Sequence, residues 1–489
     1  MKLFLKRFEK TYLFLIKALL LASLFVTFFG FYMQMLPQLE GLNRTSVVSF
    51  VTFLLSIILF IRIYGGFSIG ERKSRPIVNT MFLATLMADF ITFIITYIMG
   101  ISTVHYHDYL TGQTALPGPP PVRFSDFIGF YFTERVLPGL GLLVIVLLVQ
   151  VLLINAFTYF GNFVYFKVND PRKALIIYHD ENEIPNLLLK ISKYRKQWVV
   201  NRLIQYDDPA VHKEIVANEA VFFADVPKNE RSQLVEYCYK HNKDIFVCPD
   251  VSDIILNHAD HLMLDDTTVF ASTTRGMSFE QLVIKRLCDI LFSVVFILIT
   301  SPIMIAVSIA IKAYDHGPVL YKQKRLTKGG REFNVLKFRS MIVDAEKNTG
   351  AMLSTENDSR ITPVGKWIRR FRVDELPQLF NILKGDMSVV GPRPERLEIA
   401  EEYEKDLPEF RYRLKVQAGL TGLAQIMSKY NTAPKDKLAL DLVYIEQYSI
   451  WLDIKLMLQT LVVFVKSDST EGVHEEEAIP DLPEKQNEE

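Results

Sequence analysis

The sequence predicts a membrane protein with three parts: an α-helical bundle of four spans, a cytoplasmic α/β domain, and an α+β domain with a re-entrant membrane helix. Long apolar stretches crowd the region before residue 165 and recur near residue 300, and strand and helix signals alternate between them. The 489 residues suffice for two or three domains. The formal net charge is zero, so no nucleic acid partner is indicated.

Four apolar stretches define the first part, residues 1–165. Each is long enough to cross a hydrocarbon core of about 30 Å. Asp89 lies inside the third stretch, where we expect it to pack against neighbouring helices, the alternative being that it is part of a site. A polar contact from Asp89 would also make a homodimer plausible. The four stretches are Tyr12–Leu36, Val47–Ile63, Ile77–Ile101 and Val136–Phe160.

The distribution of basic residues gives the orientation of the spans. Lysine and arginine gather before the first span, between the second and third, and after the fourth, whereas the other two loops contain few of them. The positive-inside rule therefore places the N-terminus and everything after the fourth span in the cytoplasm. The first span is expected to remain as an anchor, because no small-residue cleavage site follows it.

A fifth apolar stretch lies within residues 285–312 and is basic at both ends. Ser301 and Pro302 are near its middle, and a proline inside a helix removes a backbone donor and bends the helix. A bent, re-entrant helix would return both basic ends to the cytoplasmic face. The alternative is a plain proline-kinked span.

Residues 172–274 show βαβ patterning, with strand signals at Lys173–His179, Ala220–Val226 and Asp244–Pro249. This pattern predicts a Rossmann-like domain with a mainly parallel sheet. The first strand ends in Tyr-His-Asp-Glu, so the glycine turn that cradles a dinucleotide is missing. A structural or oligomerising role is the better interpretation.

Residues 280–466 form the third part, and the acidic tail 467–489 follows it. Within this part Asp374 and Glu375 lie among arginines, shortly before the turn Gly391-Pro-Arg-Pro394. Carboxylates beside arginines suit phosphate chemistry, because a carboxylate can attack phosphorus or bind a metal while guanidinium groups neutralise oxyanions. A lone acidic pair is usually a solvated surface feature, so the basic surroundings matter.

Six motifs in fixed order, together with Ser301-Pro302, closely resemble the bacterial sugar transferase family, the monotopic polyprenyl-phosphate phosphoglycosyl transferases. The large members of this family initiate capsule, exopolysaccharide or O-antigen synthesis at the bacterial inner membrane, with the catalytic domain in the cytoplasm. The motifs are Lys337–Met341, Arg360–Thr362, Asp374–Gln378, Gly385–Ser388, Gly391–Pro394 and Gly419–Gln425.

The resemblance implies transfer of a sugar-1-phosphate from a nucleotide diphosphate sugar, expected to be a UDP-sugar, to undecaprenyl phosphate. Asp374 would be the nucleophile that forms a phosphosugar-aspartyl intermediate, and Glu375 would help to hold Mg²⁺. The resemblance also assigns substrate-binding residues, with Asp441 near the metal as well. These are Lys337, Arg339, Arg393, Gly419, Thr421, Gln425 and Asp441.

Two positions depart from the family pattern: Ala418 stands where many members have proline, and Thr327 where many have glycine. We expect both to bear on donor choice. Two other functions stay open at this point. A membrane nucleotide-sugar dehydratase is disfavoured by the missing glycine loop, and a non-catalytic scaffold of a polysaccharide assembly is disfavoured by the intact acidic pair.

Overall fold

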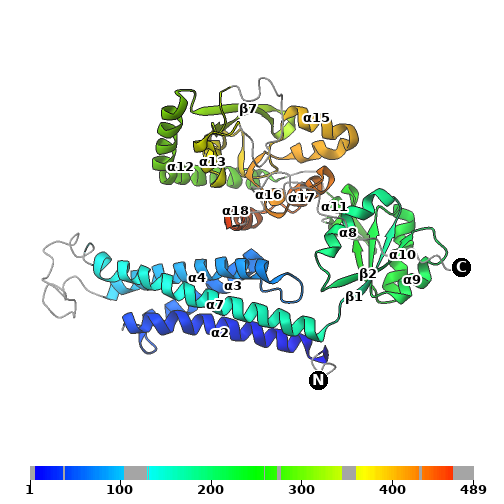
Figure 1. The fold of residues 1–489 in the computed structure, drawn as a ribbon, viewed down its shortest axis with the longest axis horizontal. Helices are drawn as coiled ribbons and strands as arrows, with labels where there is room; N and C mark the ends of the chain where they lie inside the picture. The colour runs from blue at the N-terminus through cyan, green and yellow to red at the C-terminus, as the bar shows by residue number, and fades with distance from the viewer. Residues whose placement is uncertain are drawn as a thin grey trace. The chain divides into compact units, whose positions relative to one another are not determined.

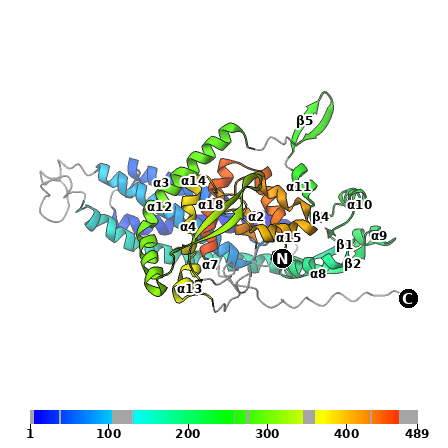
Figure 2. The same ribbon diagram turned by 90° about the horizontal axis from the view of Figure 1, so that it is seen from above.

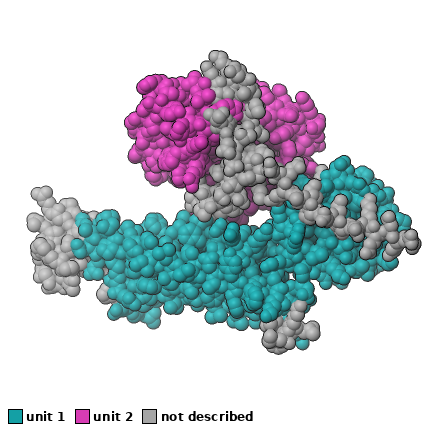
Figure 3. All heavy atoms as spheres, viewed as in Figure 1, with its two compact units in different colours: residues 1–247, 479–489 teal, residues 248–478 magenta. Residues whose placement is uncertain are grey.

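The computed structural model describes residues 6–36, 39–103, 129, 131–257, 259–272, 277–343, 360–428 and 432–465. The chain divides into two compact units, one running to Val247 and the other beginning at Cys248 (Figure 3). The acidic tail predicted for residues 467–489 lies outside the described residues.

Four long helices form the membrane part of the first unit. Helix α2 packs on α7, α3 packs on α4, and α4 also packs on α7 (Figure 1). With α12 of the second unit, they make five helices in the described residues that are long and apolar enough to cross a membrane. The four are α2 (Glu9–Met35), α3 (Arg44–Tyr64), α4 (Ser74–Thr103) and α7 (Leu137–Val168), the last preceded by the π-helical turn η2 (Phe132–Val136).

Asp89 lies inside this helical bundle and is fully buried. The Gln150 amide on α7 donates to the Asp89 carboxylate across 3.4 Å. The packing interpretation of Asp89 is therefore supported. Because the side chain does not reach the lipid-facing surface, it is not available for a polar contact with a second copy of the chain.

The rest of the first unit is an α/β domain with a four-stranded parallel sheet in the order β2-β1-β3-β4. Successive side chains of a strand point to opposite faces, and each face is covered: α9 and α10 pack on one, α8 on the other. The strands are β1 (Arg172–Tyr178), β2 (Trp198–Gln205), β3 (Ala220–Ala224) and β4 (Asp244–Val247). The helices are η3 (Glu181–Glu183), α8 (Ile184–Ser192), α9 (Val211–Ala217) and α10 (Lys228–Lys240).

The α/β domain ends earlier than the sequence leads us to expect. Helix α11 (Val251–Asn257) belongs to the second unit, where Ile254 packs with Phe410 and Leu438. The hairpin of β5 (Asp260–Leu264) and β6 (Thr267–Ala271) follows, with most of its side chains exposed.

Helix α12 (Phe279–Asp315) contains Pro302 and consists of two limbs that meet at a bend (Figures 1 and 2). The first limb contacts α14 and β9. The second limb packs through Val307 and Ile311 on Phe338 and Ile368. Both limbs therefore rest on the same module, while the apolar side chains between them, such as Leu298 and Ile299, are exposed.

The remaining elements build this module around two small sheets. Strands β7 and β8 form an antiparallel hairpin, and β9 pairs in parallel with β10. The elements are β7 (Leu320–Leu326), η4 (Lys328–Gly330), β8 (Glu332–Phe338), α13 (Pro363–Arg370), η5 (Val373–Glu375), α14 (Gln378–Lys384), β9 (Ser388–Val390), α15 (Leu397–Asp406), η6 (Pro408–Lys415), β10 (Gly419–Thr421), α16 (Leu423–Met427), α17 (Pro434–Glu446) and α18 (Ile450–Val465).

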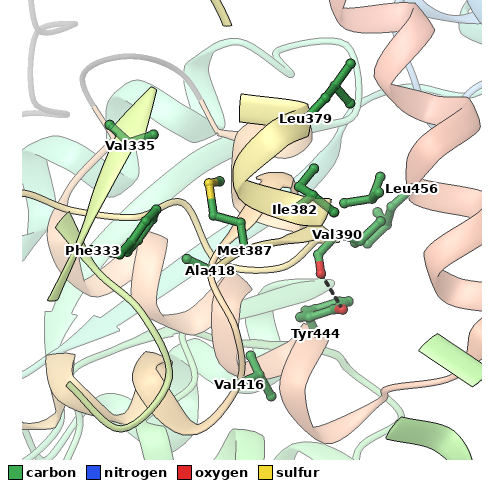
Figure 4. Packing of buried hydrophobic residues seen from close by; sticks show 11 residues of the cluster. Phe333, Val335, Leu379, Ile382, Met387, Val390, Val416, Ala418, Tyr444 and Leu456 are labelled. Atoms are coloured by element: carbon green, nitrogen blue, oxygen red, sulfur yellow. Dashed lines mark hydrogen bonds between the residues drawn. The ribbon is translucent and has the colours of Figure 1, made fainter. Parts of the chain in front are cut away.

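The core of the module lies between β8, α14 and β9. Phe333 and Val335 from β8 face Leu379 and Ile382 from α14, and Met387 packs with them (Figure 4). The Tyr444 hydroxyl donates to the Val390 carbonyl at 3.1 Å, so α17 is joined to the end of β9. This core sets the relative positions of the two segments that hold the acidic pair and the Gly391–Pro394 turn.

Candidate active site

Asp374 and Glu375 lie in η5, the short helical turn between α13 and α14. Helix α13 ends at Arg370, Arg372 takes a left-handed conformation with φ of 53° just before η5, and Pro377 precedes the first residue of α14. The short turn that carries both carboxylates is therefore fixed at its two ends by α13 and α14. We find no hydrogen bond or ion pair to the Asp374 carboxylate among the described residues.

Glu375 is held by two cations through one oxygen. The Lys337 ammonium from β8 lies 3.1 Å from Glu375 Oε1, and the Arg393 guanidinium lies 3.0 Å from the same atom. The Arg393 side chain is still 42% exposed, so part of it remains accessible from solvent. The structure thus brings four of the predicted site residues together.

The two carboxyl groups have opposite pKa shifts. Burial and the neighbouring Glu375 charge raise the pKa of Asp374, against the opposing charges of Lys337 and Arg369. Burial also disfavours the charged form of Glu375, but Lys337 and Arg393 outweigh it and lower its pKa below the usual range. Glu375 is thereby kept as a permanent anion, while Asp374 is the more basic of the pair.

Arg339 has a different partner from Lys337 and Arg393. Its guanidinium pairs with Asp315 at the end of α12, and it is 8% exposed. A Cβ at Gly317 would lie 2.0 Å from an Arg339 nitrogen, so a larger residue there would displace the end of the Arg339 side chain. In this structure Arg339 joins the strand that carries Lys337 to the membrane helix.

Gly419, Thr421 and Gln425 pack against the Gly391–Pro394 turn. The Gly391 N–H donates to the Thr421 carbonyl, and the Gly419 N–H donates to the Pro392 carbonyl, both at 2.8 Å. A Cβ at Gly419 would lie 2.1 Å from the Gly391 nitrogen, so only glycine permits this approach. The Gln425 amide lies 3.5 Å from the Gly419 carbonyl. The described contacts of this loop stabilise the turn that carries Arg393.

Asp441 on α17 is buried, 1% exposed, and pairs with Arg413 at 2.8 Å. Burial raises the pKa of Asp441 to about 6, although Arg413 opposes the shift. Within the described residues there is no group of three or more acidic, histidine or cysteine side chains that could hold a metal ion. Asp374 and Glu375 form a two-carboxylate set, which fits Mg²⁺ when phosphate oxygens supply further ligands.

Three residues of α12 bind the backbone of the segments that carry the site. The Lys285 ammonium donates to the Val390 carbonyl at 3.0 Å and pairs with Asp453 at 2.6 Å. Asp289 accepts from the Val389 N–H at 2.9 Å. Arg286 donates to two carbonyls at the end of α14, both at 2.6 Å. Lys285 and Arg286, which form the basic end that precedes the fifth apolar stretch, thus have partners inside the module.

The described fold combines helices long and apolar enough to cross a membrane with an acidic pair beside two cations. Comparison with known proteins agrees with this. The bacterial sugar transferase family matches residues 280–467, and a Bacillus subtilis protein, provisionally named an undecaprenyl-phosphate N-acetylgalactosaminyl 1-phosphate transferase, is 48% identical over 146 residues, 30% of this chain and 81% of its own length. The chain belongs to the bacterial sugar transferase family.

Longer relatives match over part of their length. The UDP-N-acetylgalactosamine-undecaprenyl-phosphate N-acetylgalactosaminephosphotransferase of Aeromonas hydrophila is 42% identical over 181 residues, 36% of this chain and 43% of that protein. The UDP-glucose:undecaprenyl-phosphate glucose-1-phosphate transferase of Xanthomonas campestris is 32% identical over 308 residues, 56% of this chain and 64% of that protein. The chain thus spans between about two fifths and two thirds of these relatives.

The two departures from the family pattern are in direct contact. The Thr327 hydroxyl accepts from the Ala418 N–H at 3.2 Å and donates to the Asp386 carbonyl at 3.0 Å. Both residues are buried. Proline at 418 would have no N–H to donate, and glycine at 327 would have no hydroxyl to accept it. Among the described residues the pair is a structural exchange in the core, and its effect on donor choice stays a prediction.

We expect this pair to behave as a unit. Thr327→Gly leaves the buried Ala418 N–H without a partner and should lower the free energy of unfolding by about 1–3 kcal/mol. Thr327→Gly combined with Ala418→Pro removes donor and acceptor together, so it should be less destabilising than the sum of the two single changes. Chemical unfolding of the four proteins measures the coupling, with Thr327→Ser as the control. If the effects of the two substitutions on the free energy of unfolding are additive, the predicted coupling is wrong.

Proposed function

We propose that this protein transfers a sugar-1-phosphate from a UDP-sugar to undecaprenyl phosphate, the first membrane step in the synthesis of a surface polysaccharide. The observation that carries the proposal is the Asp374–Glu375 pair with Lys337 and Arg393 bound to Glu375 Oε1. The names of the Aeromonas hydrophila and Xanthomonas campestris relatives support a UDP-sugar donor and undecaprenyl phosphate as acceptor.

Asp374 is the proposed nucleophile. Its carboxylate attacks the phosphorus that bears the sugar, an acyl phosphate bond forms, and the bond to the α-phosphate breaks with release of UMP. The phosphate oxygen of the lipid then attacks the same phosphorus and frees the carboxylate. Asp374 suits this role because it makes no ion pair in the described residues and has the raised pKa of a more basic, more nucleophilic anion.

Glu375, Lys337 and Arg393 prepare the site for an anionic donor. Glu375 holds both cations beside Asp374, and the exposed part of Arg393 supplies N–H groups for phosphate oxygens. Asp374 and Glu375 would hold Mg²⁺ together with the diphosphate, and the bound ion would neutralise charge as the carboxylate approaches the phosphate. Preorganised positive charge of this kind stabilises the charge that develops in the transition state.

We propose a re-entrant course for α12 at the bacterial inner membrane, with residues 280–466 on the cytoplasmic face. The packing of both limbs on one module supports this, because Lys285 in the first limb and Val307 in the second touch segments of the same core. A straight helix of 37 residues would separate its ends by about 55 Å. With this course of α12, the phosphate of the lipid acceptor and the polar UDP-sugar would meet at the membrane–water interface.

The N-terminal unit is assigned a supporting role. Its parallel sheet is of Rossmann-like type, and Tyr178 and His179 follow where a nucleotide-binding domain would have its glycine turn. We propose that the unit contributes stability and contact with later enzymes of the pathway. Self-association as a homodimer stays a prediction that requires residues other than Asp89.

The first prediction concerns the nucleophile. Asp374→Asn should reduce UMP release by at least about a thousandfold, because an amide cannot form the acyl phosphate, and Glu375→Gln should reduce it about 10- to 100-fold by loosening its cations and the metal. A panel of UDP-sugars with purified protein measures this. Asp406→Asn, an exposed change on α15, should keep full activity. Wild-type rates in a folded Asp374→Asn protein would rule out the mechanism.

The second prediction concerns pH. Because the pKa of Asp374 is raised, the reactive anion forms above the usual aspartate range, and kcat/KM for UMP release should rise with pH through that raised value. Lys337→Met removes a charge that favours the anion, so the rise should move to higher pH, whereas Lys337→Arg should leave it in place. An unchanged pH profile in Lys337→Met would show that the rise belongs to another group.

The third prediction concerns the course of α12. Cysteines at Phe279 and Tyr314, which are 77% and 52% exposed, should both resist an impermeant thiol reagent in whole cells and react in inverted vesicles. Leu42→Cys, in the loop predicted outside, is the control that should react in cells. The background carries serine at the native cysteines, Cys238, Cys248 and Cys288. Opposite labelling of Phe279→Cys and Tyr314→Cys would establish a true span.

A further inference from the structure

The turn Gly391–Pro394 is bonded along its backbone. Gly391 and Pro392 bond to the β10 segment, and the Pro394 carbonyl accepts from Arg325 at 3.1 Å. The carbonyl of Arg393, the residue whose side chain binds Glu375, accepts from the Arg413 guanidinium at 3.0 Å. Arg413 lies in η6, where no motif marks it.

The Arg413 side chain is almost fully buried, 4% exposed, among several partners. Its guanidinium pairs with Asp441 at 2.8 Å and Glu395 at 3.4 Å, and stacks over the Phe410 ring at 4.7 Å. A chain of contacts therefore runs from Asp441 through Arg413 and the Arg393 backbone to Glu375. Because guanidinium is planar with its donors in fixed directions, this arrangement fixes the Arg393 carbonyl in direction as well as in distance.

We propose that Arg413 is a positioning residue for Arg393, and that Asp441 acts as the buried counter-ion of Arg413 and is not a ligand of the metal. Asp441 is 1% exposed and its described ion pair is with Arg413. A carboxylate that pairs with a buried arginine offsets the cost of burying that charge, so it is required even without a metal.

The proposal rests on the proposed transferase function for its kinetic test. Arg413→Gln should lower kcat/KM for the UDP-sugar about 10- to 100-fold, because a charged hydrogen bond to the Arg393 carbonyl is lost. Asp441→Asn should cause a similar loss, and the double variant should lose no more than either single variant. Arg411→Gln is the matched control on the same element, with a side chain 68% exposed, and should keep wild-type kcat/KM.

Two measurements need no activity. Amide hydrogen exchange of residues 391–395 should rise in Arg413→Gln while β8 and α14 keep their protection. The Mg²⁺-dependent shift in melting temperature, measured with UDP present, should be unchanged in Asp441→Asn and reduced in Glu375→Gln. If Arg413→Gln does not fold, the double variant, which buries no unpaired charge, takes its place.

The outcomes separate the possibilities. Loss of the Mg²⁺-dependent shift in Asp441→Asn alone would make Asp441 a metal ligand and overturn the proposal. Wild-type kcat/KM, or unchanged exchange of residues 391–395, in a folded Arg413→Gln protein would also overturn it. If the wild-type protein releases nucleotide from no UDP-sugar, the transferase function fails, and the exchange and Mg²⁺ measurements still decide the roles of Arg413 and Asp441.

Discussion

The attachment of the active-site segments to a membrane helix is the constraint on which the second unit depends. Lys285 and Asp289 bind the backbone of β9, and Arg286 binds the end of α14. Strand β9 leads to Arg393, and α14 follows the acidic pair. The helix is thus part of the module, and hydrogen bonds and an ion pair fix the position of the carboxylate-bearing segments relative to this apolar helix.

The electrostatics of the site follow from this fixed geometry. One carboxylate, Glu375, satisfies Lys337 and Arg393 and keeps both cations in place, which leaves Asp374 without a partner among the described residues. The pKa of Asp374 is raised because burial and the Glu375 charge outweigh its cationic neighbours, whereas the pKa of Glu375 is lowered because Lys337 and Arg393 outweigh its burial. Two neighbouring residues of the same chemical type can therefore have different roles, one as a support and the other as the reacting group.

The sequence predicts the features that depend on local pattern. Long apolar helices at the predicted stretches, strands β1, β3 and β4, and the acidic pair beside Arg393 are present in the structure. Strand β2 and the β5–β6 hairpin were missed, because their exposed or mixed side chains give no clear period. Arg413 and the internal partners of Lys285 could not be predicted, since a salt bridge between distant segments leaves no local pattern. Asp441 was assigned to the metal and substrate site by resemblance to the family, and a resemblance does not reveal its ion pair with Arg413.

The contact between Thr327 and Ala418 has a consequence for any stepwise exchange of this pair with the glycine and proline of the family pattern. Threonine beside proline leaves the hydroxyl bonded to the Asp386 carbonyl, so that intermediate keeps its buried groups paired. Alanine beside glycine leaves a buried N–H unpaired, at a cost of about 1–3 kcal/mol. A stepwise exchange between glycine with proline and threonine with alanine is therefore less costly through threonine with proline than through glycine with alanine.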